Sequence, residues 1–193
     1  MATIVEVRNE RYGIPKYAGI IMTKADFLGW ESDDNYVYEF SNGVLEPTTG
    51  MRQEEMAIIQ RITRRFAQTI AYQNDAELIP EIEVWVSEKQ MRRPDLSFYT
   101  SEQIAASKKR DPVMPSFVAE IVSENDDARK YIKKLHGYFQ AGVQNVWLVF
   151  PDDYTVYVYT SPKTVTICTD NDVLSAAPAL PELQMTVTEL FRR

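Results

Sequence analysis

One segment constrains the fold of this chain more than any other, the run Ser116-Phe-Val-Ala-Glu-Ile-Val-Ser123. Apart from the acidic Glu120, its central residues are all apolar, so both faces of an extended strand would be apolar. Strands of this kind occur in sheets that are covered on both faces, usually by helices. The run therefore predicts a buried strand in the middle of an α/β protein.

Glu120 is the most informative side chain in this run, because burial removes the water around a charged carboxylate. An unpaired buried charge is too costly to keep, so Glu120 needs a cation, a partner or a raised pKa. Two interpretations are open. Glu120 forms a structural ion pair with an arginine, or it belongs to a functional site, where perturbed carboxylates gather. We favour the functional interpretation.

Asp95 is a second candidate, at the start of a strand that follows Pro94. In an extended strand, Leu96 and Phe98 point to the face opposite Asp95. Alone, Asp95 is equally well explained as a turn or strand-edge aspartate. Together with Glu120 on an adjacent strand, it forms the kind of oxygen site that binds a hard divalent cation.

Glu39 is a third candidate ligand, because it lies inside the apolar run Tyr36-Val-Tyr-Glu-Phe40. Taken alone, it fits the solvent face of a half-exposed strand just as well. A tight hairpin is predicted here, since Asn42-Gly43 separates two strand-like runs and Asn-Gly favours the primed turns.

Lys134 is judged by its position on a helix predicted over 126–141. Five apolar residues form one arc of this helix: Tyr131, Ile132, Leu135, Tyr138 and Phe139. Lys133 lies nearly opposite the arc, whereas Lys134 lies roughly 40° beyond its edge. Lys134 can therefore reach inward along the apolar surface, although a surface lysine is the alternative for an isolated residue.

Composition limits the class of protein. The chain has 193 residues, 45% hydrophobic and 25% charged, which is typical of one globular domain. The net charge of −7 and the pI of about 4.9 exclude a generally basic nucleic-acid coat protein, but not a local basic face. No stretch is long and apolar enough for a membrane span, and we find no signal-peptide pattern.

Cysteine and histidine are almost absent. A single cysteine, Cys168, cannot form an internal disulfide or a cysteine zinc site, and a reducing compartment such as the cytoplasm fits best. A single histidine, His136, argues against zinc chemistry and against a serine or cysteine nucleophile activated by histidine. Any chemistry must rest on carboxylates, lysines and arginines.

Periodicity predicts the remaining elements. We expect a short helix from Thr23 to about Ser32, capped by Thr23 with Asp26 at its third position. Longer helices are expected over 51–72 and 126–141, and a short polar one over 101–106. Strands are expected over 36–40, 44–46, 78–86, 95–99, 117–122, 146–150, 156–159 and 164–168, followed by an apolar tail over 183–191 that docks on the body. This order is typical of a mixed α/β sheet with helices packed on it.

Four motifs stand in order along the chain: Tyr38-Glu39-Phe-Ser-Asn-Gly43-Val-Leu-Glu46, Arg93-Pro94-Asp95-Leu-Ser-Phe98, Phe117-Val-Ala-Glu120-Ile-Val-Ser123 and Lys134-Leu-His-Gly-Tyr138-Phe-Gln-Ala-Gly142-Val143-Gln-Asn-Val-Trp147-Leu-Val-Phe-Pro151. In this order they resemble the Uma family of restriction endonucleases, within the PD-(D/E)XK nuclease superfamily. The resemblance covers roughly Thr23 to Phe191. It implies an N-terminal arm over 1–22 and one restriction endonuclease-like domain over 23–193, with a mixed β-sheet flanked by helices.

The resemblance also implies roles for the candidate residues. Asp95 and Glu120 would bind Mg²⁺ or Mn²⁺, Glu39 would be an additional acidic catalytic residue, and Lys134 would be the catalytic lysine. In the superfamily this lysine usually stands two residues after the glutamate, where this chain has Val122; the following helix supplies Lys134 instead. DNA would be the substrate, and a homodimer is expected.

The sequence leaves three functions open. The first is a metal-dependent endonuclease acting on DNA. The second is a binding protein with the nuclease fold and little or no activity, which the net charge and the departures from the family pattern at Asn42, Gln53 and Phe150 would favour. The third is a metal-dependent hydrolase of a smaller phosphate ester.

Three clusters of basic residues could contact phosphate groups. For any one cluster taken alone, a position on the solvated surface is the better explanation. The clusters are Lys89 with Arg92 and Arg93, Lys108 to Arg110, and Arg61 with Arg64 and Arg65.

Overall fold

A central sheet of six strands organises the computed structural model, which describes residues 13–48, 53–108, 113–123 and 128–192. The strand order is β10-β9-β8-β7-β6-β3, and β7 pairs with β8 in parallel while the other pairs are antiparallel. The strands are β3 Glu77–Ile79, β6 Leu96–Tyr99, β7 Phe117–Ile121, β8 Asn145–Phe150, β9 Thr155–Ser161 and β10 Thr164–Thr169. The mixed α/β fold with helices on the sheet confirms the predicted fold class.

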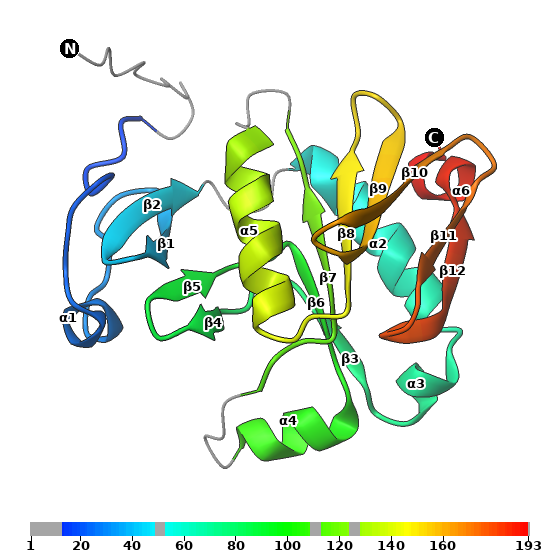
Figure 1. The fold of residues 1–193 in the computed structure, drawn as a ribbon, viewed down its shortest axis with the longest axis horizontal. Helices are drawn as coiled ribbons and strands as arrows, with labels where there is room; N and C mark the ends of the chain where they lie inside the picture. The colour runs from blue at the N-terminus through cyan, green and yellow to red at the C-terminus, as the bar shows by residue number, and fades with distance from the viewer. Residues whose placement is uncertain (1–12, 49–52, 109–112, 124–127, 193) are drawn as a thin grey trace.

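Helices cover the two faces of this sheet, as the apolar sequence of β7 requires. In Figure 1, α5 (Ala128–Gln140) lies in front of the sheet and α2 (Gln53–Phe66) lies behind it. One core is built by α5 on β7 and β8, with Tyr138 and Leu148 among its residues. The other core lies under α2 and contains Ile62 and Trp147, both fully buried. Glu120 therefore sits between two apolar layers.

The second core is closed by the end of the chain. Strands β11 (Val173–Ala176) and β12 (Leu180–Thr186) form a two-stranded sheet, and α6 (Val187–Phe191) packs beside α2. Arg61 and Arg65 of α2 donate hydrogen bonds to main-chain carbonyls of α6 and β12, those of Leu190 and Gln184 among them. The predicted docking of the tail is confirmed, although β11 was not predicted.

A smaller sheet lies to one side of α5 (Figure 1), with the order β2-β1-β5-β4. Its strands are β1 Val37–Ser41, β2 Val44–Thr48, β4 Val84–Ser87 and β5 Gln90–Arg92. The predicted hairpin is confirmed, because Asn42 and Gly43 both have positive φ, 52° and 86°, as a primed turn requires. Before it, residues 19–22 bond to the β2 hairpin, and Thr23 and Asp26 form the expected capping box of α1 (Lys24–Leu28).

Three predicted elements needed correction. The first two residues of the helix predicted over 51–72 lie outside the described residues, and the rest forms two helices, because Thr69 caps a second one, α3 (Ile70–Gln73). The strand over 78–86 is interrupted after Ile79, where Pro80 cannot donate to a ladder, and its two ends belong to different sheets. The first helix ends at Leu28 rather than Ser32. The helix over 101–106 is confirmed as α4 (Ser101–Ser107).

Candidate active site

Asp95 lies immediately before β6, and Glu120 lies on the neighbouring strand β7. The antiparallel register of these strands pairs Leu96 with Ala119 and Ser97 with Val118, so Asp95 stands at the end of the pairing, next to Glu120. The two carboxyl groups are close enough for the charge of Glu120 to act on Asp95. The main-chain N–H of Ile121 donates a hydrogen bond to Asp95 Oδ2 and holds that carboxylate at the strand junction.

Glu120 points toward α5, where its carboxylate contacts Lys134 and Tyr138. Leu96 and Phe98 lie in the core on the other face, together with Ala119 and Ile121. Leu96 and Phe98 share the core face that alternation along the strand requires, whereas the orientation of the Asp95 side chain stays a prediction. Placing two like charges close to each other is unfavourable unless a cation lies with them.

Lys134 supplies a cation from α5, and its side chain is buried. Its Nζ lies 3.2 and 3.1 Å from the two carboxylate oxygens of Glu120, and 2.9 Å from Glu39 Oε1. Lys133 is exposed, so the predicted contrast between the two lysines is confirmed. Ile132, expected within the apolar arc, is 55% exposed instead, because it lies at the edge of the arc.

Tyr138, one turn further along α5, completes the surroundings of Glu120. Its hydroxyl donates a hydrogen bond to Glu120 Oε1, and its ring is fully buried. Tyr138 was predicted only as a core residue. The signal for its second role was its position four residues after Lys134, which places the two side chains on one face of the helix.

Glu39 comes from β1 in the smaller sheet, and its carboxylate is bound from three sides. Besides Lys134, the Arg92 guanidinium donates from 3.2 Å to Oε2, and the Arg93 main-chain N–H donates from 3.0 Å to Oε1. Arg92 also reaches Glu46, at 3.1 Å. Arg92 was predicted for a phosphate contact or a solvated surface, but its side chain is 3% exposed and is committed to these carboxylates.

The charges in this cluster do not balance. Glu39, Glu120 and Asp95 contribute three carboxylates, whereas Lys134 and Arg92 contribute two cations. Loss of hydration, and secondarily the facing Glu120, raises the pKa of Asp95 well above its usual range. Burial also raises the pKa of Glu120, against the opposing effect of Lys134. The excess negative charge lies on the two strand carboxylates.

Glu39 and Lys134, by contrast, both keep their charge. Burial alone would raise the pKa of Glu39, but Lys134 and Arg92 outweigh it and lower that pKa. Burial would lower the pKa of Lys134, but the Glu120 and Glu39 carboxylates outweigh it and raise that pKa. Lys134 is therefore an ammonium at neutral pH and cannot serve as a general base.

The raised pKa of Asp95 makes the stability of the metal-free protein depend on pH. A carboxyl that binds its proton more tightly in the folded chain than in the unfolded chain loses stability as pH rises through its folded pKa. We expect the free energy of unfolding in EDTA to fall as pH rises above about 4, the ordinary value for Asp. Thermal unfolding of the wild type and of Asp95→Asn across this range measures the effect. An identical slope in the two proteins would contradict it.

Glu55 of α2 is a residue that the sequence analysis missed. It is 6% exposed, and its negative charge contributes to the raised pKa of Asp95. The signal was a carboxylate one turn before Ile58 and Ile62, which face the core. After Glu39, Asp95 and Glu120, Glu55 is thus a fourth acidic side chain whose charge acts on this cluster.

A divalent metal fits this donor set. Among the described residues, no group of three or more His, Cys, Asp and Glu side chains is arranged to hold a metal ion. Mg²⁺, however, is commonly bound through one or two carboxylates, with water and substrate phosphate as the other ligands. Asp95 and Glu120 offer two carboxylates with excess negative charge, which is the chemistry such an ion requires.

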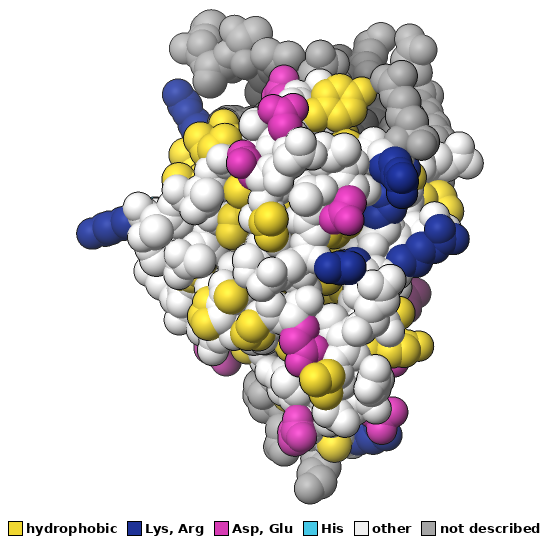
Figure 2. All heavy atoms as spheres, turned by 90° about the vertical axis from the view of Figure 1, so that its right-hand side faces the viewer, with side chains coloured by type: hydrophobic (Ala, Val, Ile, Leu, Met, Phe, Trp, Pro, Cys, Tyr) yellow, Lys and Arg dark blue, Asp and Glu magenta, His cyan; other side chains and the backbone are white. Residues whose placement is uncertain are grey.

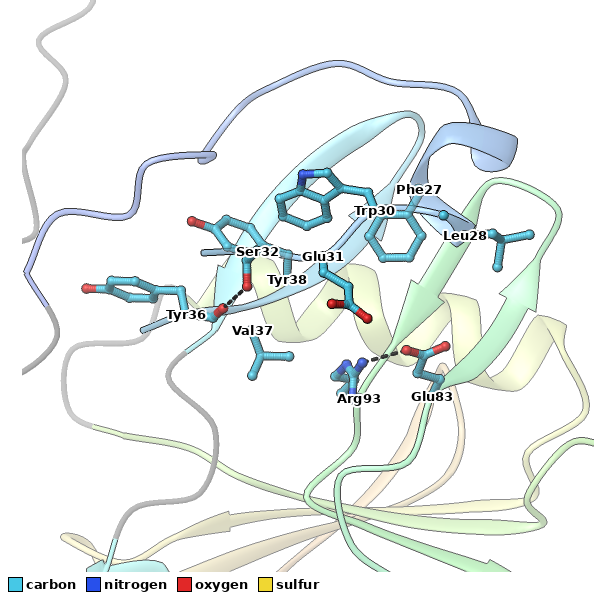
Figure 3. Close-up of a pocket in the computed structure, with 11 residues that line it drawn as sticks. Phe27, Leu28, Trp30, Glu31, Ser32, Tyr36, Val37, Tyr38, Glu83 and Arg93 are labelled. Atoms are coloured by element: carbon cyan, nitrogen blue, oxygen red, sulfur yellow. Dashed lines mark hydrogen bonds and ion pairs between the residues drawn. The ribbon is translucent and has the colours of Figure 1, made fainter. Parts of the chain in front are cut away.

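A cavity of 780 Å³ lies beside this cluster, on the other side of β1. Tyr38 faces the cavity while its neighbour Glu39 faces Lys134, as alternation along a strand dictates. Figure 3 shows the aromatic side chains of Phe27, Trp30 and Tyr36 around it, and the ion pair of Arg93 with Glu83, 2.5 Å apart. The carboxylates of the candidate site do not line this cavity.

The face seen in Figure 2, from the side of β11, β12 and α6, carries basic side chains toward both edges, with acidic ones between them. Arg61 and Arg65 are committed to main-chain carbonyls, which favours the structural interpretation of their cluster. Lys109 and Arg110 lie outside the described residues.

Comparisons with known proteins show the family and a similar fold. A family model described as "Uma2: Putative restriction endonuclease" matches residues 25–188. A solved structure from Anabaena variabilis ATCC 29413, described as a putative nuclease belonging to DUF820, has a similar fold. It is 19% identical, with a TM-score of 0.75 over 88% of this chain and 97% of that chain. No curated protein matches. In the described parts of the chain, no helix has the length and apolar character to span a membrane.

Proposed function

Because the chain belongs to the Uma2 family, described as "Putative restriction endonuclease", we propose that it is a divalent-metal-dependent endonuclease that hydrolyses phosphodiester bonds in DNA. Family membership supports a nuclease function. The metal, the DNA substrate and the roles of individual residues are the proposal. The observation that carries it is the proximity of the Asp95 and Glu120 carboxyl groups at the end of the β6–β7 pairing, with Lys134 in contact with Glu120.

In this proposal Asp95 and Glu120 hold one Mg²⁺ or Mn²⁺ ion. The ion would lower the pKa of a bound water and offset the charge on the scissile phosphate. Asp95 is fixed for this role by the Ile121 N–H, and Glu120 by the Tyr138 hydroxyl and Lys134. These contacts set the direction of each carboxylate before any ligand arrives, so little reorganisation is required on binding.

Lys134 acts as a fixed positive charge. Its raised pKa keeps it protonated, so its role is to stabilise the negative charge that develops on the phosphate oxygens. Glu39 is a positioning residue, because it contacts Lys134 and Arg92 and holds the ammonium from the side of β1.

The test is cleavage of a supercoiled plasmid with Mg²⁺, with Mn²⁺ and with EDTA. We expect cleavage only with metal, and a loss of at least about a thousandfold in Glu120→Gln, because one ligand of the ion becomes neutral. Glu77→Gln, at an exposed position on β3, is the matched control and should cleave like the wild type. Cleavage in EDTA, or cleavage that persists in Glu120→Gln, would contradict the proposal. Absence of cleavage together with absence of metal-induced thermal stabilisation would favour the binding protein with a nuclease fold.

A further inference from the structure

The cavity of 780 Å³ on the other side of β1 has no role in the reaction proposed above. It lies between the end of α1, strand β1 and the ends of β4 and β5, and its walls carry four aromatic side chains, Phe27, Trp30, Tyr36 and Tyr38 (Figure 3). Trp30 is only half-buried, so part of its ring is open to the cavity. Because flat aromatic rings stack on one another, walls of this kind favour a ligand with a planar ring.

The Trp30 ring is held in place by its neighbours. Tyr17 and Tyr38 meet it edge to face, with ring centroids 5.0 and 5.4 Å from its own. Tyr38 is fixed in turn, because its hydroxyl donates a hydrogen bond to the Asp34 carboxylate over 2.6 Å. A ring that is already held loses little conformational freedom when a ligand stacks on it, so this wall is prepared for binding.

One side of the cavity carries groups that accept hydrogen bonds together with a group that donates them. Figure 3 shows the carboxylate of the exposed Glu31 on the same side of the cavity as Arg93 and Glu83. The Arg93 guanidinium donates to Glu83 from 2.5 Å, and its buried Nε has no hydrogen-bond partner among the described residues. Since a guanidinium has five N–H donors, Arg93 can also donate to a ligand oxygen. A ring that bears both an amino group and a carbonyl oxygen therefore fits this side of the cavity, whereas a simple cation would meet Arg93.

Arg93 connects the cavity with the candidate active site. Its side chain lines the cavity, while its main-chain N–H donates to Glu39 Oε1 from 3.0 Å. Asp95 follows two residues later, so the Cα atoms of Arg93 and Asp95 are at most about 7 Å apart. The base and the phosphate of one nucleotide are separated only by its sugar. A nucleotide whose phosphate lies at Asp95 can therefore extend its base toward the cavity.

We propose that this cavity binds one unpaired base of the DNA strand, and that it favours guanine and cytosine. The inference rests on the proposed function for the identity of the ligand as DNA. The base stacks on Trp30, its amino group donates to Glu31, and its carbonyl oxygen accepts from Arg93. Guanine and cytosine carry both groups, whereas adenine lacks the carbonyl oxygen and thymine lacks the amino group. A paired base cannot enter a cavity, so the nucleotide comes from single-stranded DNA or turns out of the duplex.

The test is the binding of fluorescently labelled oligo(dC) and oligo(dT) to the full chain in EDTA, followed by anisotropy at low salt. The wild type should bind oligo(dC) at least about fivefold more tightly than oligo(dT), because only cytosine offers the amino group. Trp30→Leu should raise the dissociation constant for oligo(dC) at least about fivefold, because the stacking surface is lost. Trp85→Leu is the matched control, since Trp85 is also half-buried in the same small sheet but does not line the cavity. Unchanged circular dichroism shows that each variant is folded.

A second variant tests the choice of base. Glu31→Leu should reduce the preference for oligo(dC) to below about twofold, whereas Glu77→Leu, at an exposed position on β3, should keep it. Equal binding of the two oligomers by the wild type, no binding at about 100 μM protein, or a Trp30→Leu variant that binds like the wild type would overturn the proposal. These measurements contain no metal and involve no cleavage. A chain that prefers oligo(dC) but cuts no DNA would therefore contradict the nuclease function and still support the base site.

Discussion

Replacing Lys134 with methionine is expected to remove about 3–5 kcal/mol from the free energy of unfolding, the largest effect of any single change considered. Methionine keeps the length and apolar stem of lysine, so the change removes charge and little volume. Glu39 and Glu120, whose side chains are 2% and 3% exposed, then lose their shared cation. Removing one member of a buried ion pair leaves a buried charge uncompensated, and that is the source of the cost.

Thermal and urea unfolding of Lys134→Met measure this effect. A fall of about 10 °C in Tm is expected for a chain of this length. Lys133→Met is the matched control, since Lys133 is the exposed neighbour on the same helix, and it should change stability by less than about 0.5 kcal/mol. Adding Glu39→Gln to Lys134→Met should recover part of the loss, because one unpaired charge disappears. Equal stability of Lys134→Met and Lys133→Met would show that the ammonium does not hold the cluster together.

Replacing Asp95 with asparagine is expected to act in opposite directions on activity and on metal-free stability. Cleavage should fall by at least about a thousandfold, since one of two metal ligands becomes neutral. The metal-free protein should become more stable by about 1 kcal/mol, because the asparagine carries no charge to be desolvated and its repulsion with Glu120 disappears. The asparagine oxygen can still accept the Ile121 N–H, so the local backbone is preserved.

The control for this change is Asp152→Asn, at an exposed turn, which should leave stability and cleavage unchanged. Differential scanning calorimetry in EDTA gives the stability, and plasmid cleavage gives the activity. A metal-free Asp95→Asn that is less stable than the wild type would indicate that Asp95 is a structural hydrogen-bond acceptor first. Asp95 and Glu120 would then not be a pair of carboxylates that binds a metal ion.

Much of the buried site could be predicted from local sequence. A glutamate within an apolar strand and an aspartate at the start of another were enough to expect two carboxylates in a dry place. The helical position of Lys134 relative to Tyr131 and Tyr138 predicted that it points inward. These inferences worked because alternation along strands and the turn of a helix fix side-chain directions over a few residues.

The partners of these residues could not be predicted in the same way. Glu39 and Lys134 are 95 positions apart in the printed sequence, and their 2.9 Å contact depends on how the smaller sheet packs beside α5. Arg92 was grouped with exposed basic residues because its neighbours in sequence are charged. Its burial comes from the pairing of β5 with β1, which brings it beside Glu39 and Glu46.

The boundaries that failed have simple physical reasons. Pro80 divided a run that reads as one long strand, because its missing N–H ends the ladder, and the chain then passes to a different sheet. The long helix over 51–72 divided at Thr69, whose hydroxyl caps a new helix by accepting from the Tyr72 N–H. In both cases a single side chain that competes with the regular pattern decided the local structure.

The central claim is that Asp95 and Glu120 bind one divalent ion between them. Titration of the protein with Mn²⁺, followed by electron paramagnetic resonance of the free ion, tests this without any assumption about the substrate. One ion should bind per chain, with affinity that falls at least about a hundredfold in Asp95→Asn and in Glu120→Gln and is unchanged in Asp152→Asn. Wild-type binding that survives both substitutions, or a wild type that binds no Mn²⁺, would contradict the claim.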